Sequence, residues 1–249
     1  MLTIVVPMAG RGTRFASVGY ADPKPLIPVA GQPMIKRVID NLTPLRPHRF
    51  VFVCQVEHLQ AYDLKGKLEA WAPGCAVVGI DGVTEGAACT VLLAAEHIGS
   101  NPLMIANSDQ YVDLPIDDYL AVGDQGYDGL IMTMTADDAK WSFAGIGPHG
   151  LVDRVVEKEV ISNEATVGVY NFARGTDFVN GAQAMIAAGE RVNGEFYVAP
   201  VYNLLIAGGA RVAVSNIGAD RDGMYGLGTP ADLDFFKTTP IYTRMAAAP

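Results

Sequence analysis

Positive charge is scarce in this chain, which has 18 Lys and Arg residues against 27 Asp and Glu and a net charge of −9. Nucleic acid binds a broad basic surface, so we predict no nucleic-acid partner. No apolar run reaches the roughly 20 residues that cross a membrane, and we predict no membrane partner. The chain starts directly with a core strand, so we expect no signal peptide and a cytoplasmic location.

Cysteine and histidine are also scarce. Cys54, Cys75 and Cys89 lie in apolar surroundings without C-x-x-C spacing, and the four histidines are scattered. This pattern predicts reduced thiols and argues against a disulfide framework or a structural zinc site.

Hydrophobic residues, in contrast, make up 50% of the 249 residues, and the mean hydropathy is +0.21. That content is enough for the core of one large α/β domain. We find no repeat, low-complexity tract or linker, and predict a single domain over residues 1–240 with a C-terminal tail over 241–249.

Apolar runs alternate with helical patterns through the first half of the chain. This alternation predicts a Rossmann-like, doubly wound α/β fold with three layers and a mostly parallel mixed sheet. Strands become denser after residue 129, which indicates a small antiparallel element. The expected strands are 2–6, 50–54, 76–80, 103–106, 130–135, 151–156, 166–172 and 211–215, and the expected helices are 34–42, 59–68, 87–98, 177–188, 195–207 and 230–236.

A loop rich in glycine and arginine follows the first strand, with the sequence Ala-Gly-Arg-Gly-Thr-Arg over residues 9–14. Its glycines let the backbone approach a ligand, and its arginines and threonine offer charge and donors. Such a loop at the carboxyl end of a parallel strand is typical of phosphate sites. The G-x-G-x-x-G pattern fails at Phe15, and no G-x-x-x-x-G-K-S/T motif is present. A plain tight turn explains the glycines alone equally well.

Local charge favours a phosphate ligand over a plain turn. Residues 1–37 carry five basic residues and one acid, a net of +4, so the remainder carries −13. A small cationic region in an acidic protein indicates a small anionic ligand.

Two separate segments carry a resemblance to a known family. Gly10-Arg-Gly-Thr-Arg14, followed by Pro23-Lys-Pro-Leu-Ile-Pro28, resembles the G-x-G-T-R and P-K-x-L-L/I-P signature of the nucleoside-triphosphate:sugar-phosphate nucleotidylyltransferases. The resemblance implies a nucleoside triphosphate, a phosphorylated small-molecule acceptor and Mg²⁺ as cofactor. It implies catalytic roles for Arg14 and Lys24 on the triphosphate, and nucleotide binding by Ala9, Gly10, Arg11, Gly12 and Thr13.

The polar residues Asn-Ser-Asp-Gln over 107–110 follow the predicted strand 103–106. An acid just beyond a parallel strand can hold a magnesium ion that bridges phosphates, although such clusters are also common caps and turns. The resemblance implies that Asp109 is the catalytic metal ligand, and we place Ser108 on the nucleotide. Asp113 is expected to be a turn acid.

Small residues over 84–89 precede the predicted helix 87–98. They allow a flat base to approach the backbone, but Thr84 or Glu85 could equally cap the helix. The resemblance implies that Glu85, Gly86 and Ala87 contact the nucleobase, and these residues do not indicate which base is bound.

Two segments near residues 157 and 168 resemble parts of the acceptor site. Residues 157–159 resemble an E-K-P segment, which implies that Lys158 binds the acceptor phosphate and that Glu157 binds the acceptor; Glu159 replaces the family proline. Residues 168–172 resemble G-I/L-Y-x-F, in which Gly168 makes room for a sugar ring. A solvated lysine and an ordinary strand are the alternatives from composition alone.

Two further acceptor residues come from segments matched by position. Ser142 lies in the segment that corresponds to the family's acceptor loop, beside Trp141, which is equally suited to the core. Glu195 lies in a segment that resembles G-E-x-x, where a carboxylate at a helix start would accept hydrogen bonds from sugar hydroxyls.

The segment 224–230 departs from the family pattern W-x-D-x-G-T-P, because Gly226 replaces the aspartate that is the second magnesium ligand. We therefore expect fewer protein ligands at the metal, substitution by Asp220 or Asp222, or a loss of catalysis.

The expected reaction transfers a nucleoside monophosphate to a sugar 1-phosphate, which gives a nucleotide sugar for polysaccharide biosynthesis. One alternative is a cytidylyltransferase for a non-sugar phosphate, such as a phosphorylated alcohol or amino-acid derivative. Another is a non-catalytic regulatory relative that binds nucleotide or sugar phosphate, which Gly226 favours. Asp109 and Asp113 lack the D-x-D spacing of a glycosyltransferase. A homo-oligomer remains open.

Overall fold

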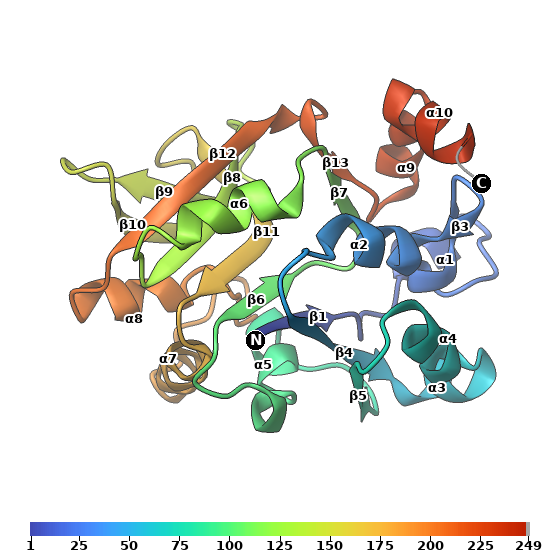
Figure 1. The fold of residues 1–249 in the computed structure, drawn as a ribbon, viewed down its shortest axis with the longest axis horizontal. Coiled ribbons are helices and arrows are strands. Elements are labelled where there is room, and N and C mark those ends of the chain that lie inside the picture. The colour runs from blue at the N-terminus through green and yellow to red at the C-terminus, as the bar shows by residue number, and fades with distance from the viewer. Residues whose placement is uncertain (248–249) are drawn as a thin grey trace.

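A computed structural model describes residues 1–247 and contains an 11-stranded mixed sheet and a separate two-stranded sheet (Figure 1). The strand order is β5-β4-β1-β6-β11-β8-β12-β13-β7, and β9 joins β10 to β11. The strands are β1 (Leu2–Pro7), β2 (Pro28–Val29), β3 (Gln32–Pro33), β4 (His48–Gln55), β5 (Ala76–Ile80), β6 (Leu103–Ala106), β7 (Gln110–Val112), β8 (Gly129–Thr135), β9 (Ser142–Ile146), β10 (Val152–Glu157), β11 (Glu164–Phe172), β12 (Val212–Asp220) and β13 (Gly223–Gly226).

The amino-terminal half of the large sheet is parallel. Strand β1 lies between β4 and β6 and pairs in parallel with both, and β4 pairs in parallel with β5. All four strands therefore end at the same edge, and the loops that follow them meet there.

The direction of the sheet changes at β11, which is antiparallel to both of its neighbours, β6 and β8. Beside it, β9 and β10 form an antiparallel pair, which is the element expected after residue 129. The predicted α/β, Rossmann-like class with a mixed sheet is confirmed.

Helices cover both faces of the sheet, which gives three layers (Figure 1). One buried cluster joins the sheet to α2, α4 and α6, and a second joins it to α5, α7 and α8. The helices are α1 (Thr13–Ala16), α2 (Met34–Leu42), α3 (Val56–Ala61), α4 (Leu64–Trp71), α5 (Ala87–Leu92), α6 (Ile116–Gly123), α7 (Gly175–Ala187), α8 (Val201–Ala207), α9 (Pro230–Lys237) and α10 (Pro240–Ala247), with 3-10 turns at Lys24–Leu26 and Ala95–His97.

Three predicted helices differ from the observed ones. The helix expected over 59–68 is divided into α3 and α4, because Asp63 adopts a left-handed conformation with φ of 48°. The helix expected over 87–98 ends at Leu92 and is followed by a 3-10 turn. The helix expected over 195–207 begins only at Val201, after Pro200, whose ring suits a helix start.

A third buried cluster joins the amino-terminal loops to the carboxyl-terminal helices. Phe15 and Ile27 pack in it with Phe236 of α9 and Ile241 of α10. The segment expected to be a tail from residue 241 is thus helical as far as Ala247, while residues 248 and 249 lie outside the described part. The division into a domain and a tail stays a prediction. Within residues 1–247, no helix has the length and apolar character needed to span a bilayer.

Candidate active site

The loops that follow β1, β5 and β6 surround a cavity of about 350 Å³. The parallel register places the ends of these strands at one edge, so segments far apart in the sequence line the same space. Eight of the predicted site residues line it: Ala9, Gly10, Lys24, Gly86, Ala87, Ser108, Asp109 and Glu195. Glu195, predicted on the acceptor, thus lies in the same cavity as residues predicted on the nucleotide.

Lys24 and Asp109 form an ion pair in this cavity. The ammonium nitrogen of Lys24 lies 2.8 Å from Oδ2 of Asp109, and their side chains are 19% and 26% exposed. Lys24 begins a 3-10 turn between Pro23 and Pro25, and this stiff segment holds the lysine against the cavity.

The arginines of the glycine-rich loop lie outside the cavity. Gly12 has φ of 62° and caps α1, and a Cβ there would lie 3.1 Å from Cβ of Lys24. The loop is therefore packed against the lysine. Arg11, Thr13 and Arg14 are exposed, and none of the three lines the cavity.

Gly86 brings the loop after β5 against the chain at Phe196. Its φ is 134°, and a Cβ would overlap the backbone of Phe196. The amide of Phe196 donates to the carbonyl of Glu85 at 2.8 Å, which holds the two backbones together. Because of this close approach, only glycine fits at position 86. The Glu85 side chain itself points away, 2.5 Å from Arg191, and does not line the cavity.

A second cavity, of about 240 Å³, adjoins the first and shares Ala87 and Asn107 with it. Ser142, Glu157 and Gly168, predicted on the acceptor, all line it.

Gly168 makes room for the side chain of Asn107 in the wall between the two cavities. A Cβ at Gly168 would overlap the amide nitrogen of Asn107, and the backbone amide of Asn107 donates to the carbonyl of Gly168 at 3.0 Å. The glycine therefore accommodates a protein side chain directly, rather than only a sugar ring.

Glu157 is a buried carboxylate in the wall of the second cavity, where it accepts a hydrogen bond from Ser142. Burial raises the pKa of Glu157 above its ordinary value of 4.5, although the hydrogen bond from Ser142 and the charge of Lys158 oppose this shift. A buried carboxylate of this kind accepts hydrogen bonds from a ligand's hydroxyl or amino groups.

Lys158 is exposed and does not line the second cavity, but it donates at 2.6 Å to the hydroxyl of Tyr197, which does line it. This hydrogen bond raises the pKa of Lys158. Lys158 has φ of 58°. Because a following proline disfavours that conformation, Glu159 in place of the family proline permits the turn.

The residues around Asp109 fit a magnesium ion that is held mainly by phosphates. The backbone of Gly228 packs so close to Oδ2 of Asp109 that a Cβ there would overlap it. Mg²⁺ is usually held by one or two carboxylates together with substrate phosphates and water, and Asp109 supplies one such carboxylate. Among residues 1–247, no group of three or more potential metal-ligating side chains occurs.

The substitutes considered for the missing aspartate lie elsewhere. Asp220 is 3.4 Å from Lys140, and neither Asp220 nor Asp222 lines the cavity of Asp109. Gly226 pairs with Gln110 between strands β13 and β7 and lies beside Asp232. Thr229 caps helix α9 by accepting a hydrogen bond from the backbone amide of Asp232. The site therefore has fewer carboxylates than the family pattern implies.

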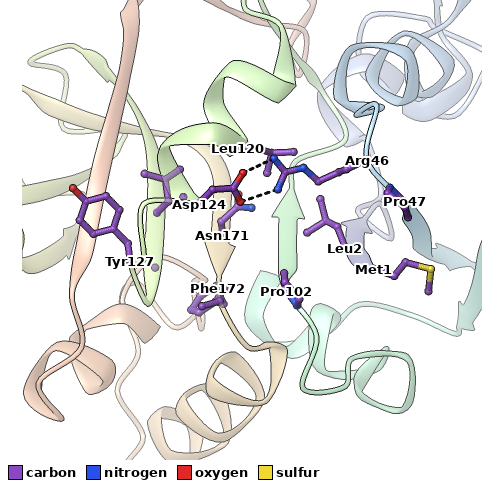
Figure 2. A pocket seen from close by; sticks show the side chains of 14 residues that line it. Met1, Leu2, Arg46, Pro47, Pro102, Leu120, Asp124, Tyr127, Asn171 and Phe172 are labelled. Carbon is purple, nitrogen blue, oxygen red and sulfur yellow. Dashed lines mark hydrogen bonds and ion pairs between the residues drawn. The ribbon is translucent and has the colours of Figure 1, made fainter.

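A further cavity, of about 350 Å³, lies at the amino ends of β1, β4 and β6, on the other side of the sheet from the loops described above (Figure 2). Arg46 and Asp124 face each other there in a two-bond ion pair, at 3.0 and 2.8 Å, above Leu2 and Phe172. None of its lining residues belongs to the two cavities described above.

Sequence reasoning missed two residues of the site, Asn107 and Tyr197. Asn107 stands directly after β6, two residues before Asp109, and this position at the end of a parallel strand could have indicated it. Tyr197 stands two residues after Glu195 in a segment without a distinguishing pattern, and only the fold brings it to Lys158.

Comparison with known proteins identifies the fold and the family. A model of the MobA-like NTP transferase domain matches residues 4–139, more than half of the chain. The bifunctional protein GlmU of Burkholderia orbicola is 30% identical over 233 residues, which cover 86% of this chain and 47% of that protein. The chain thus spans about half the length of this curated relative.

Solved structures share the whole architecture. A nucleoside-diphosphate-sugar pyrophosphorylase of Vibrio cholerae RC9 superposes with a TM-score of 0.81 and 25% identity, covering 94% of this chain and all of the other. An inositol-1-phosphate CTP transferase of T. maritima shares the fold, with a TM-score of 0.71 and 16% identity over 98% of this chain and 94% of the other. The resemblance predicted from the two signature segments is therefore confirmed, and the chain belongs to the MobA-like NTP transferase family of nucleotidyltransferases.

Proposed function

We propose that this protein transfers a nucleoside monophosphate from a nucleoside triphosphate to a phosphorylated acceptor, with a sugar 1-phosphate as the preferred acceptor. The observation that carries the proposal is the shared wall of the two cavities, at Ala87 and Asn107. The cavity with Lys24 and Asp109 takes the triphosphate, and the cavity with Glu157 takes the acceptor.

In the reaction, an oxygen of the acceptor phosphate forms a bond to the α-phosphorus. The bond from that phosphorus to the bridging oxygen breaks, and pyrophosphate leaves with the electron pair. The second pKa of a phosphate monoester is about 6, so the acceptor is mostly dianionic at neutral pH and needs no general base. The barrier is the repulsion between two polyanions, which positioning and neutralisation of charge lower.

The residues of the chain supply most of this neutralisation. Lys24 binds the α-phosphate, and Lys158, which is bonded to Tyr197 in the lining of the second cavity, binds the incoming phosphate. The exposed Arg11 and Arg14 belong to the same loop as Gly12, which packs against Lys24, and they bind the outer phosphates where these leave the cavity. Asp109 and the triphosphate would hold Mg²⁺, which supplies charge neutralisation at the phosphates when bound.

The test is a matrix of nucleoside triphosphates against sugar 1-phosphates, phosphorylated alcohols and phosphorylated amino-acid derivatives, with pyrophosphate release as the readout. We expect one triphosphate and a sugar 1-phosphate to stand out. Lys24→Ala should lower turnover roughly 10²–10³-fold, as loss of one donor to a developing charge does. Turnover only with a non-sugar phosphate would replace the proposed acceptor, and triphosphate binding without turnover would indicate a non-catalytic relative.

A further inference from the structure

Gln55 is a buried polar residue at the end of β4, and it lines neither cavity of the site. Its side-chain nitrogen Nε2 donates to the carbonyl oxygen of Ala9 and, at 2.5 Å, to that of Gly82. Both partners are acceptors only, so the amide has a single orientation that satisfies them.

These two carbonyls belong to two loops that both line the nucleotide cavity and that meet at Gln55. Ala9 and Gly10 follow β1, whereas Gly82 leads into Val83 and Thr84 after β5. In the sheet, β4 separates β1 from β5, so the strands that carry these loops share no backbone ladder. The side chain of Gln55 bridges this gap.

The loop after β5 is anchored independently at its other end. The hydroxyl of Thr84 lies 2.6 Å from that of Thr90 in α5 and donates to the carbonyl of Gly86 at 2.9 Å. Gly82, near the start of the loop, has φ of 81°, and its carbonyl accepts the hydrogen bond from Gln55. The spacing of the cavity walls at this end therefore depends on one side chain.

We propose that Gln55 is a positioning residue that sets the width of the nucleotide cavity through the carbonyls of Ala9 and Gly82. This inference rests on the proposed function, because it assigns the first cavity to the triphosphate. Without the amide, two carbonyls lose their donor, and the loops separate to reach water. The consequence is weaker binding of the triphosphate with little change at the acceptor cavity.

The test compares Gln55→Met with the wild type by isothermal titration of each Mg²⁺–nucleoside triphosphate and by the KM of the acceptor. Methionine keeps the length of the side chain and removes both donors. We expect triphosphate affinity to fall roughly ten-fold, as the loss of one to two ordinary hydrogen bonds allows. The acceptor KM should stay within about two-fold, because Gln55 does not reach that cavity.

Asn203→Leu is the matched control, since it also removes two side-chain hydrogen bonds to backbone. The amide of Asn203 bonds to both backbone groups of Val155 in β10, at 2.7 and 2.8 Å, on the acceptor side of the fold. This variant should lower the melting temperature and leave triphosphate affinity unchanged. An equal loss of triphosphate affinity in Asn203→Leu would overturn the positioning role, because general loosening would explain both.

A second variant, Gln55→Glu, covers the case in which Gln55→Met does not fold. A carboxyl group carries at most one proton and cannot donate to both carbonyls, so hydrogen exchange should be faster than in the wild type over residues 9–12 and 82–86 and equal to it in β9 and β10. If the wild type binds none of the triphosphates, the proposed function fails. If the wild type binds and the Gln55 variants bind equally well, only the role of Gln55 is overturned.

Discussion

The ammonium nitrogen of Lys24 lies 2.8 Å from Oδ2 of Asp109, although 85 residues separate the two in the chain. A lysine cation thus already occupies one oxygen of the carboxylate that we assign to the metal. A bound triphosphate offers Lys24 another anionic partner and frees Asp109. We infer that the metal and the nucleotide bind cooperatively.

This pair predicts that Lys24→Gln binds Mn²⁺ more tightly than the wild type in the absence of nucleotide. Removal of the competing charge should tighten binding roughly three- to ten-fold, a modest factor because the pair is partly solvated. Electron paramagnetic resonance of free Mn²⁺ measures it. Lys36→Gln removes the same charge from a pair with Asp40 on α2 and should change nothing. Unchanged Mn²⁺ affinity in Lys24→Gln would contradict the competition.

The same substitution at Gly226 and at Gly228 should have very different effects. A Cβ at Gly228 would overlap Oδ2 of Asp109, whereas the nearest atom to a Cβ at Gly226 lies 3.5 Å away. We expect Gly228→Ala to displace the carboxylate and to lower turnover and Mn²⁺ affinity roughly 10–100-fold, as loss of a supporting contact at a metal site does. Gly226→Ala should be close to wild type. Pyrophosphate release measures turnover, and equal activity of the two variants would refute the assignment.

Gly168→Ala should destabilise the fold more than Gly150→Ala. Both glycines have positive φ, 90° and 74°, but only a Cβ at Gly168 meets another residue, the amide of Asn107. We expect about 1–2 kcal/mol of backbone strain in each variant and about 1–3 kcal/mol more from overpacking at Gly168. Urea denaturation gives both free energies of unfolding. Equal losses would mean that Asn107 moves away at no cost.

Glu157 predicts a pH dependence of stability. Because burial raises the pKa of Glu157 in the folded state above its ordinary value of 4.5, the folded protein favours the protonated carboxyl. Its contribution to stability is therefore complete below pH 4.5 and is lost as the pH rises through the folded-state pKa. Glu157→Gln removes this loss and retains an acceptor for Ser142. The melting temperature of the variant should rise relative to that of the wild type between pH 4.5 and pH 7. A constant difference between the two melting temperatures over this range would contradict the raised pKa.

Much of the nucleotide cavity could be predicted from the sequence, because its residues follow parallel strands. Apolar runs marked β1 and β6, and parallel strands end at a common edge, so the loop at Gly10 and the acid Asp109 were expected to meet. The position of Arg14 outside the cavity could not be predicted. It depends on how Gly12 packs against Lys24, a contact that no local pattern encodes.

Other features depend on contacts between distant segments. The break at Asp63 depends on a left-handed backbone in a residue that periodicity places inside a helix. Gln55 stands directly after a predicted strand, as Asp109 nearly does, but its importance depends on the carbonyls of Ala9 and Gly82. Tyr197 lies 39 residues from Lys158 in the chain, and only the fold brings the two side chains together.

The hairpin of β9 and β10 carries Ser142 and Glu157, and within residues 1–247 one residue pair, Phe143 with Ala165, joins it to the other strands of the large sheet. The residues of the nucleotide cavity lie on other elements. Under the proposed assignment of the two cavities, substitutions in the hairpin should change which acceptor is bound and leave the affinity for the triphosphate unchanged. On that proposal, selectivity for the second substrate is a property of one peripheral ribbon and can be redesigned there alone.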